Sequence, residues 1–430
     1  MTSPYQGYLY AYPHKTAYRK LEPRPLLSDV WGSERQDALF GYVHLPFCEM
    51  RCGFCNLFTR ANPPQEQVRA YLTQLRRQAQ EVRSSLATDA SFAQLAIGGG
   101  TPTYLTAAEL TSLFEIVSSA FGDALPLSVE TSPATATPDR LAVLAAHGTT
   151  RISMGVQSFL DSEARAAGRP QRLTEVQAAL AAIRDSRIPV LNVDLIYGID
   201  GQTAQTWQHS LDEALRWRPE ELYLYPLYVR PLTGLGRRAA TRADWDRDRL
   251  ALYRQAVVVL TGAGYVQQSM RQFRRSDAPV VQGPDYCCQD DGMIGLGCGA
   301  RSYTTSLHYS FDYAVSVSEV RAVIDDYLSR PASDFRYAEI GFRLDEVEQR
   351  RRWLLKSLLR AEGVDPAAYQ ARFGTRHEED FPQLSALAGR GWLDSSLSVL
   401  TAEGLAYSDA IGPWLVSGPV REAMQAYVVR

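Results

Sequence analysis

Short apolar segments alternate with longer amphipathic segments between residues 38 and 229 of this 430-residue chain. The strand-like segments read ALFGYVHL, QLAIGGG, LPLSVET, RISMGVQ, VLNVDLIYG and ELYLYPLYV, and the helix-like ones include QVRAYLTQLRRQAQEVRSSL, AAELTSLFEIVSSAF and LTEVQAALAAIRDS. Such a β-α alternation predicts a parallel sheet with helices outside it. Six units of this kind indicate an α/β fold built on a partial or full (β/α)6-type barrel.

Polar or glycine-rich motifs stand at the carboxyl ends of five of these predicted strands. Three cysteines follow the first strand, and GGGTP (98–102) follows the second. Glu130 closes the third, Gln157 closes the fourth, and Asp194 lies in the fifth. Active sites of such barrels form on the loops after the strands. We therefore expect these segments, far apart in sequence, to meet at one rim.

The three cysteines have a specific spacing. The stretch HLPFCEMRCGFCNLF (44–58) places Cys48, Cys52 and Cys55 as C-x3-C-x2-C. A structural zinc site usually takes four ligands, and the only nearby fourth candidate is His44, inside a predicted strand. A disulfide between two of the three cysteines would leave the third unpaired. Three thiolates instead suit a [4Fe–4S] cluster in which one iron has no protein ligand and stays open to a substrate or cofactor.

Composition narrows the class of protein. The formal net charge is −3 and the sequence pI is about 6.1, so we expect no nucleic-acid partner. The amino-terminal stretch lacks the features of a signal peptide, and no apolar run is long enough for a membrane span. Six cysteines are few for a secreted disulfide framework. These features predict a cytoplasmic protein with reduced thiols.

The C-x3-C-x2-C motif resembles the signature of the radical SAM enzymes. The resemblance implies that Cys48, Cys52 and Cys55 hold a [4Fe–4S] cluster whose open iron chelates the amino and carboxylate groups of S-adenosylmethionine (SAM). An electron from the cluster then cleaves SAM to methionine and a 5'-deoxyadenosyl radical. In that family an aromatic residue before the third cysteine, here Phe54, packs near the adenine.

Residues 40–420 are similar to the oxygen-independent coproporphyrinogen III oxidase-like, or HemN-like, branch of that family. YVHLPFCEMRCGFCNLF resembles its opening motif and points to Tyr42 as a cofactor contact. GGGTPTYL resembles its glycine loop, in which Gly98, Gly99, Gly100 and Thr101 let the main chain approach the methionine end of SAM.

The same resemblance implies further cofactor contacts at the strand ends. Glu130 matches a carboxylate that accepts from the methionine ammonium, and Gln157 matches a polar contact. Arg169, in GRPQ, matches a position that pairs with a cofactor carboxylate, a role suited to a guanidinium. Asp194, in DLIYG, matches a contact to a ribose hydroxyl. Each of these residues taken alone would more often be structural.

The loop DDGMIGLGCGARSY (290–303) is similar to a family loop that lies near a second SAM. Arg301 stands where relatives commonly carry an apolar residue or His, so it could bind a cofactor or substrate carboxylate, or pair with Asp290 or Asp291. We interpret Cys298 as a small residue packed in the interior. We assign no role to the vicinal pair Cys287 and Cys288.

Three segments are expected along the chain. Residues 1–37 form an aromatic arm, 38–330 the radical SAM barrel with an extension, and 331–430 a helical, winged-helix-like carboxyl-terminal domain with a small β wing. The arm reads either as a segment packed on the barrel or as a lid whose His14, Lys15 and Arg19 reach acidic substrate groups. The carboxyl-terminal domain mixes Arg with Asp and Glu, so DNA binding is not expected.

Three functions remain open on the sequence. The favoured one is a radical SAM enzyme, an oxidoreductase or HemN-like methyltransferase, that modifies a small molecule, with or without a second SAM for methyl transfer. The others are coproporphyrinogen III oxidation, by decarboxylation of propionates, and a heme chaperone without turnover. An enzyme of this class needs a low-potential electron donor such as flavodoxin or ferredoxin. Neither a nucleic acid nor a membrane is an expected partner.

Overall fold

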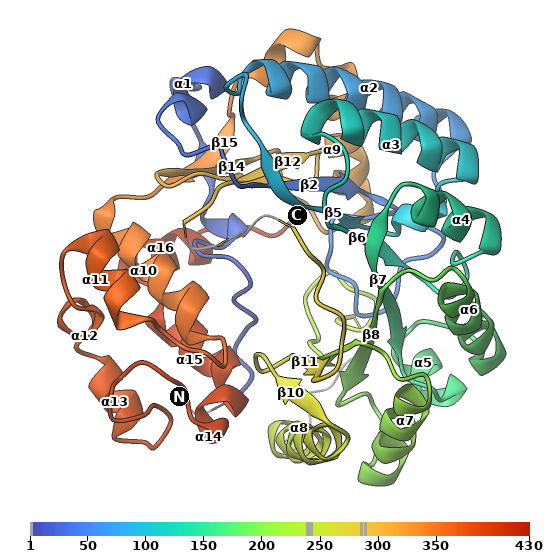
Figure 1. Ribbon diagram of the computed structural model, residues 1–430, viewed down its shortest axis with the longest axis vertical. Coiled ribbons are helices and arrows are strands. Elements are labelled where there is room, and N and C mark those ends of the chain that lie inside the picture. The colour runs from blue at the N-terminus through green and yellow to red at the C-terminus, as the bar shows by residue number, and fades with distance from the viewer. Residues whose placement is uncertain (1–2, 238–243, 284–286, 288–289) are drawn as a thin grey trace.

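The computed structural model describes residues 3–237, 244–283, 287 and 290–430. Its central feature is a curved sheet with helices on its outer side (Figure 1). The six predicted strands lie side by side in sequence order, and each pair is parallel. They are β2 (Leu39–Leu45), β5 (Phe92–Gly99), β6 (Leu127–Thr131), β7 (Thr149–Gln157), β8 (Val190–Tyr197) and β9 (Glu221–Pro226). The predicted α/β class and partial barrel are confirmed.

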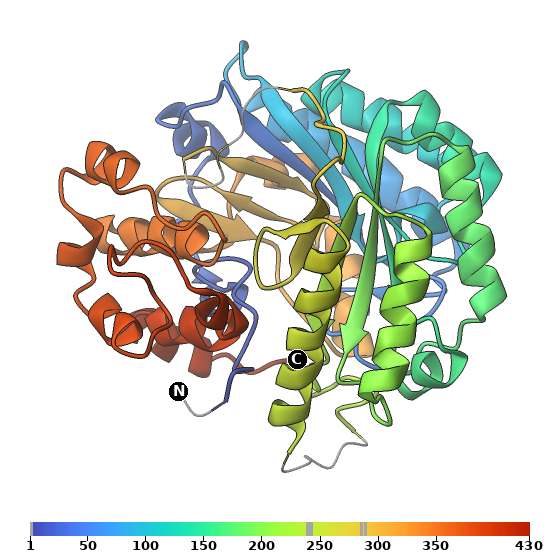
Figure 2. The same ribbon diagram turned by 60° about the horizontal axis from the view of Figure 1, so that its bottom comes forward.

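Amphipathic helices connect these strands and cover the outside of the sheet (Figure 2). They bury leucine, valine and alanine at helical spacing against it, as α2 does with Val68, Leu72, Leu75, Ala79 and Val82. The outer helices are α2 (Gln65–Ser84), α3 (Ala107–Phe121), α4 (Pro138–Ala146), α5 (Asp161–Ala166), α6 (Leu173–Asp185), α7 (Ala204–Arg216) and α8 (Trp245–Gly262). In the part of the chain that the structure describes, no helix is long and apolar enough to cross a bilayer.

The sheet continues beyond the six predicted strands on both sides. At one edge β12 pairs in parallel with β2, and antiparallel strands extend it. At the other edge β11 and β10 are added antiparallel to β9. These strands are short, which is why the apolar pattern did not reveal them. The added elements are β1 (Arg19–Lys20), β10 (Tyr265–Gln267), β11 (Gln272–Arg275), β12 (Met293–Leu296), β13 (Arg301–Tyr303), β14 (Leu307–Ser310), β15 (Ile340–Arg343) and α9 (Val317–Ser329).

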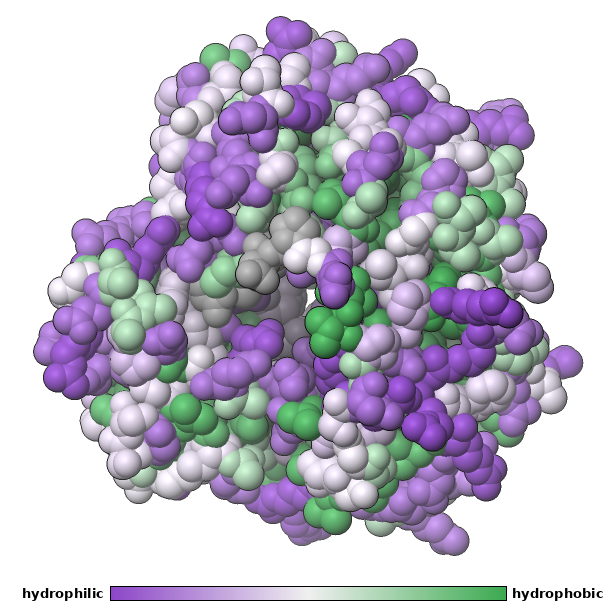
Figure 3. Space-filling view, in the orientation of Figure 1, coloured by the Kyte–Doolittle hydropathy of each residue, from purple (hydrophilic) through white to green (hydrophobic). Residues whose placement is uncertain are grey.

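A bundle of helices with its own hydrophobic core follows β15 and lies to one side of the barrel (Figure 1). Where the sequence suggested a β wing, the structure has a single bridge between Leu393 and Leu400. On the face shown in Figure 3 the surface is hollowed between this bundle and the barrel. The bundle comprises α10 (Glu346–Leu358), α11 (Pro366–Phe373), α12 (His377–Asp380), α13 (Leu384–Ala388), α14 (Ala402–Ala406), α15 (Ser408–Leu415) and α16 (Gly418–Gln425).

The amino-terminal arm runs between the bundle and the barrel and is fixed to both. The amide groups of Gln6 and Gly7 donate to the backbone carbonyl of Asp409, over 3.2 and 3.1 Å. The Tyr12 hydroxyl donates to Glu348 of the bundle. Arg271, the residue before β11, pairs with the Asp409 carboxylate, and their side chains are only 4% and 2% exposed. The arm is therefore a built part of the molecule rather than a loose tail.

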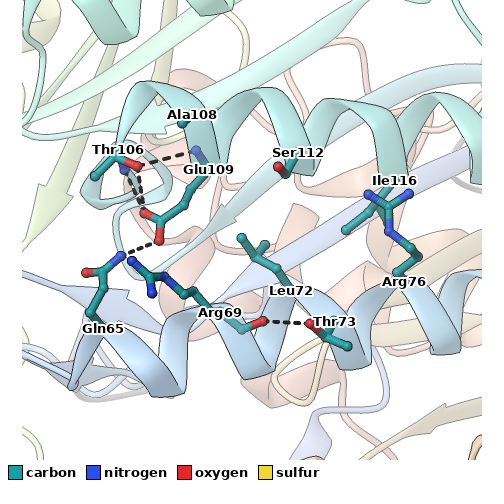
Figure 4. A pocket seen from close by; sticks show the side chains of 10 residues that line it. All are labelled: Gln65, Arg69, Leu72, Thr73, Arg76, Thr106, Ala108, Glu109, Ser112 and Ile116. Atoms are coloured by element: carbon teal, nitrogen blue, oxygen red, sulfur yellow. Dashed lines mark hydrogen bonds between the residues drawn. The ribbon is translucent and has the colours of Figure 1, made fainter.

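A groove of about 570 Å³ lies between α2 and α3 on the outer helical layer (Figure 4). Its end is closed by a capping box: the Glu109 amide donates to the Thr106 hydroxyl, and the Glu109 carboxylate accepts from the Thr106 amide. Gln65 at the start of α2 donates to the same carboxylate. This groove lies on the outer side of the barrel, so we do not associate it with the chemistry of the strand ends.

We expect Thr106→Ala to destabilise α3, because it removes the hydroxyl that satisfies a free amide at the helix start. A lost cap of this kind costs about 1 kcal/mol, which in a chain of this size lowers the melting temperature by about 1–2 °C. Thermal unfolding followed by circular dichroism measures the shift. Thr111→Ala, which removes an exposed hydroxyl within the same helix, is the control and should leave the melting temperature unchanged.

Candidate active site at the strand ends

The three cysteines lie on the loop that follows β2. This loop contains β3 (Phe47–Cys48), which pairs with β4 (Arg60–Ala61). The Cys55 amide donates to the Cys52 carbonyl over 3.1 Å, so the second half of the motif forms a tight turn. Cys48, Cys52 and Cys55 are free thiols and are half-buried. The motif is thus held rigidly with its sulfur atoms neither fully buried nor exposed.

Gly53, within the motif, packs directly against a second loop. Its amide donates to the Gly168 carbonyl over 3.0 Å, and its carbonyl accepts from the Leu235 amide over 2.7 Å. A Cβ at position 53 would lie 2.9 Å from the Ala167 carbonyl oxygen. Glycine is therefore required, because only a residue without a side chain lets the two loops approach so closely. This contact brings the loop that carries Arg169 to the cysteines.

The glycine loop after β5 lies between the cysteine loop and Glu130. Gly99 has a φ of +113°, and its amide donates to the Glu130 carboxylate over 2.9 Å. A Cβ at Gly100 would lie 2.4 Å from the Phe47 carbonyl oxygen. The next residue, Thr101, donates from its hydroxyl to the Cys48 sulfur over 3.6 Å. Cysteines, glycine loop and carboxylate are thus brought together as the sequence predicted.

Two carboxylates lie on β6 and β8, the strands on either side of β7; Glu130 is exposed and Asp194 is half-buried. Solvent reaches Glu130, but the protein around its carboxylate desolvates it and raises its pKa to about 7, an effect that the Gly99 amide partly offsets and the negative charge of Asp194 increases. Desolvation likewise raises the pKa of Asp194 to about 6, while the Asn192 amide and Arg151 oppose the shift. A cationic group placed beside these carboxylates would favour their charged forms. The site is therefore prepared for a positively charged ligand.

Gln157 and Arg169 lie at the end of β7 and on the loop after it. Gln157 has a φ of +69°, an uncommon conformation for a residue with a side chain, and it is buried. Arg169 donates from Nε to the Gln171 side chain over 3.0 Å, and its Nη1 lies 3.9 Å from the Cys52 sulfur. The guanidinium thus stands next to a cysteine, where it can neutralise negative charge.

Tyr42, Phe54 and Arg301 complete the predicted set. The Tyr42 hydroxyl lies 3.2 Å from Nδ1 of His44, and Phe54 packs against an apolar cluster that includes Ala167. Arg301 lies on β13 rather than on one of the six barrel strands, and it reaches the arm by donating to the Tyr10 hydroxyl over 2.7 Å. Its expected alternative partners, Asp290 and Asp291, form ion pairs with other arginines instead.

Asn192 is a site residue that the sequence reading missed. It is fully buried on β8 and donates to Asp194 and to the Ser153 hydroxyl, over 2.7 Å each. Its Oδ1 has no hydrogen-bond partner among the described residues. A signal was present, since Asn192 stands two positions before Asp194 and so lies on the same face of the strand. An unpaired buried acceptor of this kind suggests that a ligand supplies the donor.

The donor set fits an iron–sulfur cluster better than a zinc ion. Among the residues with a described placement, no three His, Cys, Asp or Glu side chains converge enough to hold one metal ion. Thiolates around a single zinc lie about 4 Å apart, because each Zn–S bond is about 2.3 Å. Burial raises the pKa of the Cys48 and Cys52 thiols, a cost that a metal offsets by replacing the protons. Arg169 beside Cys52 and Thr101 beside Cys48 can stabilise such a charged centre.

Comparison with known proteins agrees with this chemistry. Residues 42–214 match the profile of the Radical SAM superfamily. The chain is 29% identical to the oxygen-independent coproporphyrinogen III oxidase of Salmonella typhimurium over 373 residues, covering 83% of this chain and 80% of that protein. It is 26% identical to the heme chaperone HemW of Bacillus subtilis over 377 residues, covering 84% and 95%.

The fold has a close counterpart among solved structures. The coproporphyrinogen III oxidase of Escherichia coli superposes with a TM-score of 0.80, at 23% sequence identity, over 95% of this chain and 97% of that one. Residues 42–214 thus form a radical SAM domain, and the chain is similar over most of its length both to coproporphyrinogen III oxidases and to HemW chaperones of the HemN-like family. Its cofactors are those of the family, a [4Fe–4S] cluster and SAM.

Proposed function

We propose that this protein is a radical SAM enzyme that cleaves SAM reductively and uses the product radical to modify a small molecule. The observation that carries the proposal is the junction of three elements: the half-buried cysteines, the glycine loop and the Glu130 carboxylate that this loop contacts. That arrangement suits the binding of a cationic cofactor for turnover.

Each predicted site residue has a role in this proposal. Cys48, Cys52 and Cys55 hold the cluster, and the bound cluster with SAM supplies a 5'-deoxyadenosyl radical by one-electron reduction. Glu130 accepts from the amino group of SAM, while Gly99, Gly100 and Thr101 line its methionine end. The contacts further out are Tyr42, Phe54, Gln157, Arg169 and Asp194, which orient the adenine, the ribose and the carboxylate of SAM.

During turnover the surrounding chain would enclose these groups. The arm (residues 1–37), the barrel with its extension (38–330) and the carboxyl-terminal domain (331–430) would act as one enclosure. The Arg271–Asp409 pair and the bonds of Gln6 and Gly7 support this role of the arm, because they hold it between the other two segments. Excluding water matters for a radical, since side reactions compete with hydrogen abstraction.

Two reactions on the substrate fit the family. One is hydrogen abstraction leading to oxidative decarboxylation of propionates, the reaction that the similarity to the coproporphyrinogen III oxidases implies. The other is methyl transfer from a second SAM bound near Arg301. The electron donor would be a low-potential protein such as flavodoxin or ferredoxin, and the sparse cysteines favour a cytoplasmic location.

The test is an anaerobic turnover assay. Protein reconstituted with iron and sulfide is reduced with dithionite in the presence of SAM, and products are identified by mass spectrometry. We expect 5'-deoxyadenosine, and an electron paramagnetic resonance signal of the reduced cluster that changes when SAM is added. S-adenosylhomocysteine in addition would favour methyl transfer, and conversion of coproporphyrinogen III would favour decarboxylation. A cluster that binds SAM without ever cleaving it, together with tight heme binding, would replace the proposal with the chaperone function.

A further inference from the structure

Two half-buried cations, Lys15 on the arm and Arg301 on β13, are linked through Tyr10 and His14 and have no acidic partner: Arg301 donates to the Tyr10 hydroxyl, which lies 3.4 Å from Nε2 of His14, the residue before Lys15. Neither forms an ion pair with any described residue, although the structure contains many such pairs. Burial lowers the pKa of His44, at the end of β2, to about 4, and the charges of Lys15 and Arg301 contribute to the shift. They therefore stand near the strand end that leads into the cysteine loop.

Lys15 begins a short 3-10 helix (Lys15–Ala17) in the arm. Its Nζ lies 3.3 Å from the ring centroid of Tyr313, which stabilises the ammonium group without neutralising it. Burial lowers the pKa of Lys15 well below its usual range, Arg301 lowers it further, and only Cys55 opposes the shift. The lysine is thus close enough to Cys55 to interact with it, in surroundings that lack a carboxylate.

Arg301 is surrounded by tyrosines instead of carboxylates. Its guanidinium lies 4.7 Å from the Tyr10 ring centroid and donates to the Tyr10 hydroxyl. Tyr18 and Tyr303 also interact electrostatically with the Arg301 guanidinium. The buried Tyr18 hydroxyl has no hydrogen-bond partner among the described residues, so a donor next to Arg301 is also unused.

The two buried arginines each pair with a carboxylate, Arg271 with Asp409 and Arg249 with Asp246. Lys15 and Arg301 are half-buried and have no such partner among the described residues. A partly desolvated cation without a counter-charge is costly, and two neighbouring ones add their mutual repulsion. A ligand that brings a negative charge between them would remove this cost.

We propose that Lys15 and Arg301 together bind a carboxylate group of a ligand beside the cysteine loop, an assignment that rests on the proposed radical SAM function. The planar guanidinium can hold both carboxylate oxygens, and the ammonium adds a point charge from the arm. Tyr18 can donate a third hydrogen bond. The carboxylate belongs either to the substrate or to a second SAM molecule.

The arm then determines which substrates fit. Lys15 comes from the arm and Arg301 from the sheet, so the carboxylate site is complete only while the arm is in place. The bonds that hold the arm to Asp409 and Glu348 therefore also position Lys15. A neutral ligand of the same shape would leave both cations unpaired and is discriminated against.

Equilibrium binding to reconstituted, oxidised enzyme tests the proposal without turnover. Coproporphyrin III, a tetracarboxylate, and its tetramethyl ester are titrated by absorbance in the presence of one equivalent of SAM. The stoichiometry of radiolabelled SAM is measured by equilibrium dialysis. The variants are Lys15→Gln and Arg301→Gln. Lys20→Gln on the arm and Arg343→Gln on β15 are matched controls, because both residues are exposed.

If the substrate supplies the carboxylate, each site variant binds coproporphyrin III at least tenfold more weakly than the wild type. Its affinity for the ester and its SAM stoichiometry are unchanged. If a second SAM supplies it, the wild type binds two SAM per chain and the site variants bind one. Unchanged binding in both site variants would overturn the proposal, as would a wild type that binds neither the acid nor a second SAM. A wild type that binds the carboxylate but never forms 5'-deoxyadenosine would refute the proposed function alone.

Discussion

Replacing any one of Cys48, Cys52 and Cys55 with alanine is expected to abolish the [4Fe–4S] cluster and all SAM cleavage. Each cysteine supplies the thiolate for one iron, so its loss leaves two protein ligands for the cluster. The loop offers no substitute, because the other cysteines that the structure describes, Cys287 and Cys298, lie far from the motif in sequence and are exposed and buried, respectively. Iron and sulfide content and 5'-deoxyadenosine formation measure the effect, which should exceed a thousandfold in rate.

The matched control is Cys287→Ser, which alters an exposed cysteine outside the motif. It should keep the wild-type iron content and activity. The alanine variants should still fold, since the three thiols are half-buried and their loop is held through Gly53 and Gly100. A motif variant with wild-type iron content and turnover would show that the cluster is bound elsewhere.

The barrel strands could be predicted from the sequence because they are apolar runs of five to nine residues, most of which are buried. The run VLNVDLIY shows this: β8 buries seven of its eight residues and lies between β7 and β9. The strand β13 is only RSY, and two of its residues are half-exposed. Its pairing with β12 and β14 depends on neighbours and turns, and three residues give no recognisable period. The added strands were therefore beyond a reading of apolar patterns.

The candidate site also contains residues that could be predicted from the sequence and residues that could not. The cysteines, the glycine loop and Glu130 could be predicted because each motif is local and its chemistry belongs to the residue types. The meeting of Lys15 with Arg301 could not, because 286 positions separate them in the sequence. The path of the arm is set by bonds to Asp409 and Glu348 at the far end of the chain. Contacts of that kind leave no trace in a spacing pattern.

Glu130→Ala is expected to weaken SAM binding by about tenfold to a hundredfold while leaving the cluster in place. A hydrogen bond to a charged group contributes about 1.5–3 kcal/mol, which corresponds to that range of dissociation constants. Glu130 contacts the Gly99 amide and none of the cysteines, so iron content should not change. Equilibrium dialysis with radiolabelled SAM measures the affinity. Glu115→Ala, an exposed carboxylate on α3, is the control.

The pH dependence of binding provides a second test of the same residue. The pKa of Glu130 is raised to about 7, so below pH 7 the carboxyl group is mostly protonated and cannot pair with a cationic amino group. Binding selects the charged form and releases a proton, so affinity rises with pH through about 7 and levels off above it. From these values the wild-type dissociation constant should be about tenfold larger at pH 6 than at pH 8.

Comparison with Glu130→Gln separates this titration from other groups. SAM itself and Asp194, with a pKa raised to about 6, also change charge in this interval, but they do so equally in both proteins. Glutamine keeps the size of the side chain and an acceptor for the Gly99 amide, and it cannot titrate. The dissociation constant of Glu130→Gln divided by that of the wild type should therefore increase as pH rises from 6 to 8. A constant ratio would mean that Glu130 does not carry the charge that recognises the amino group of SAM.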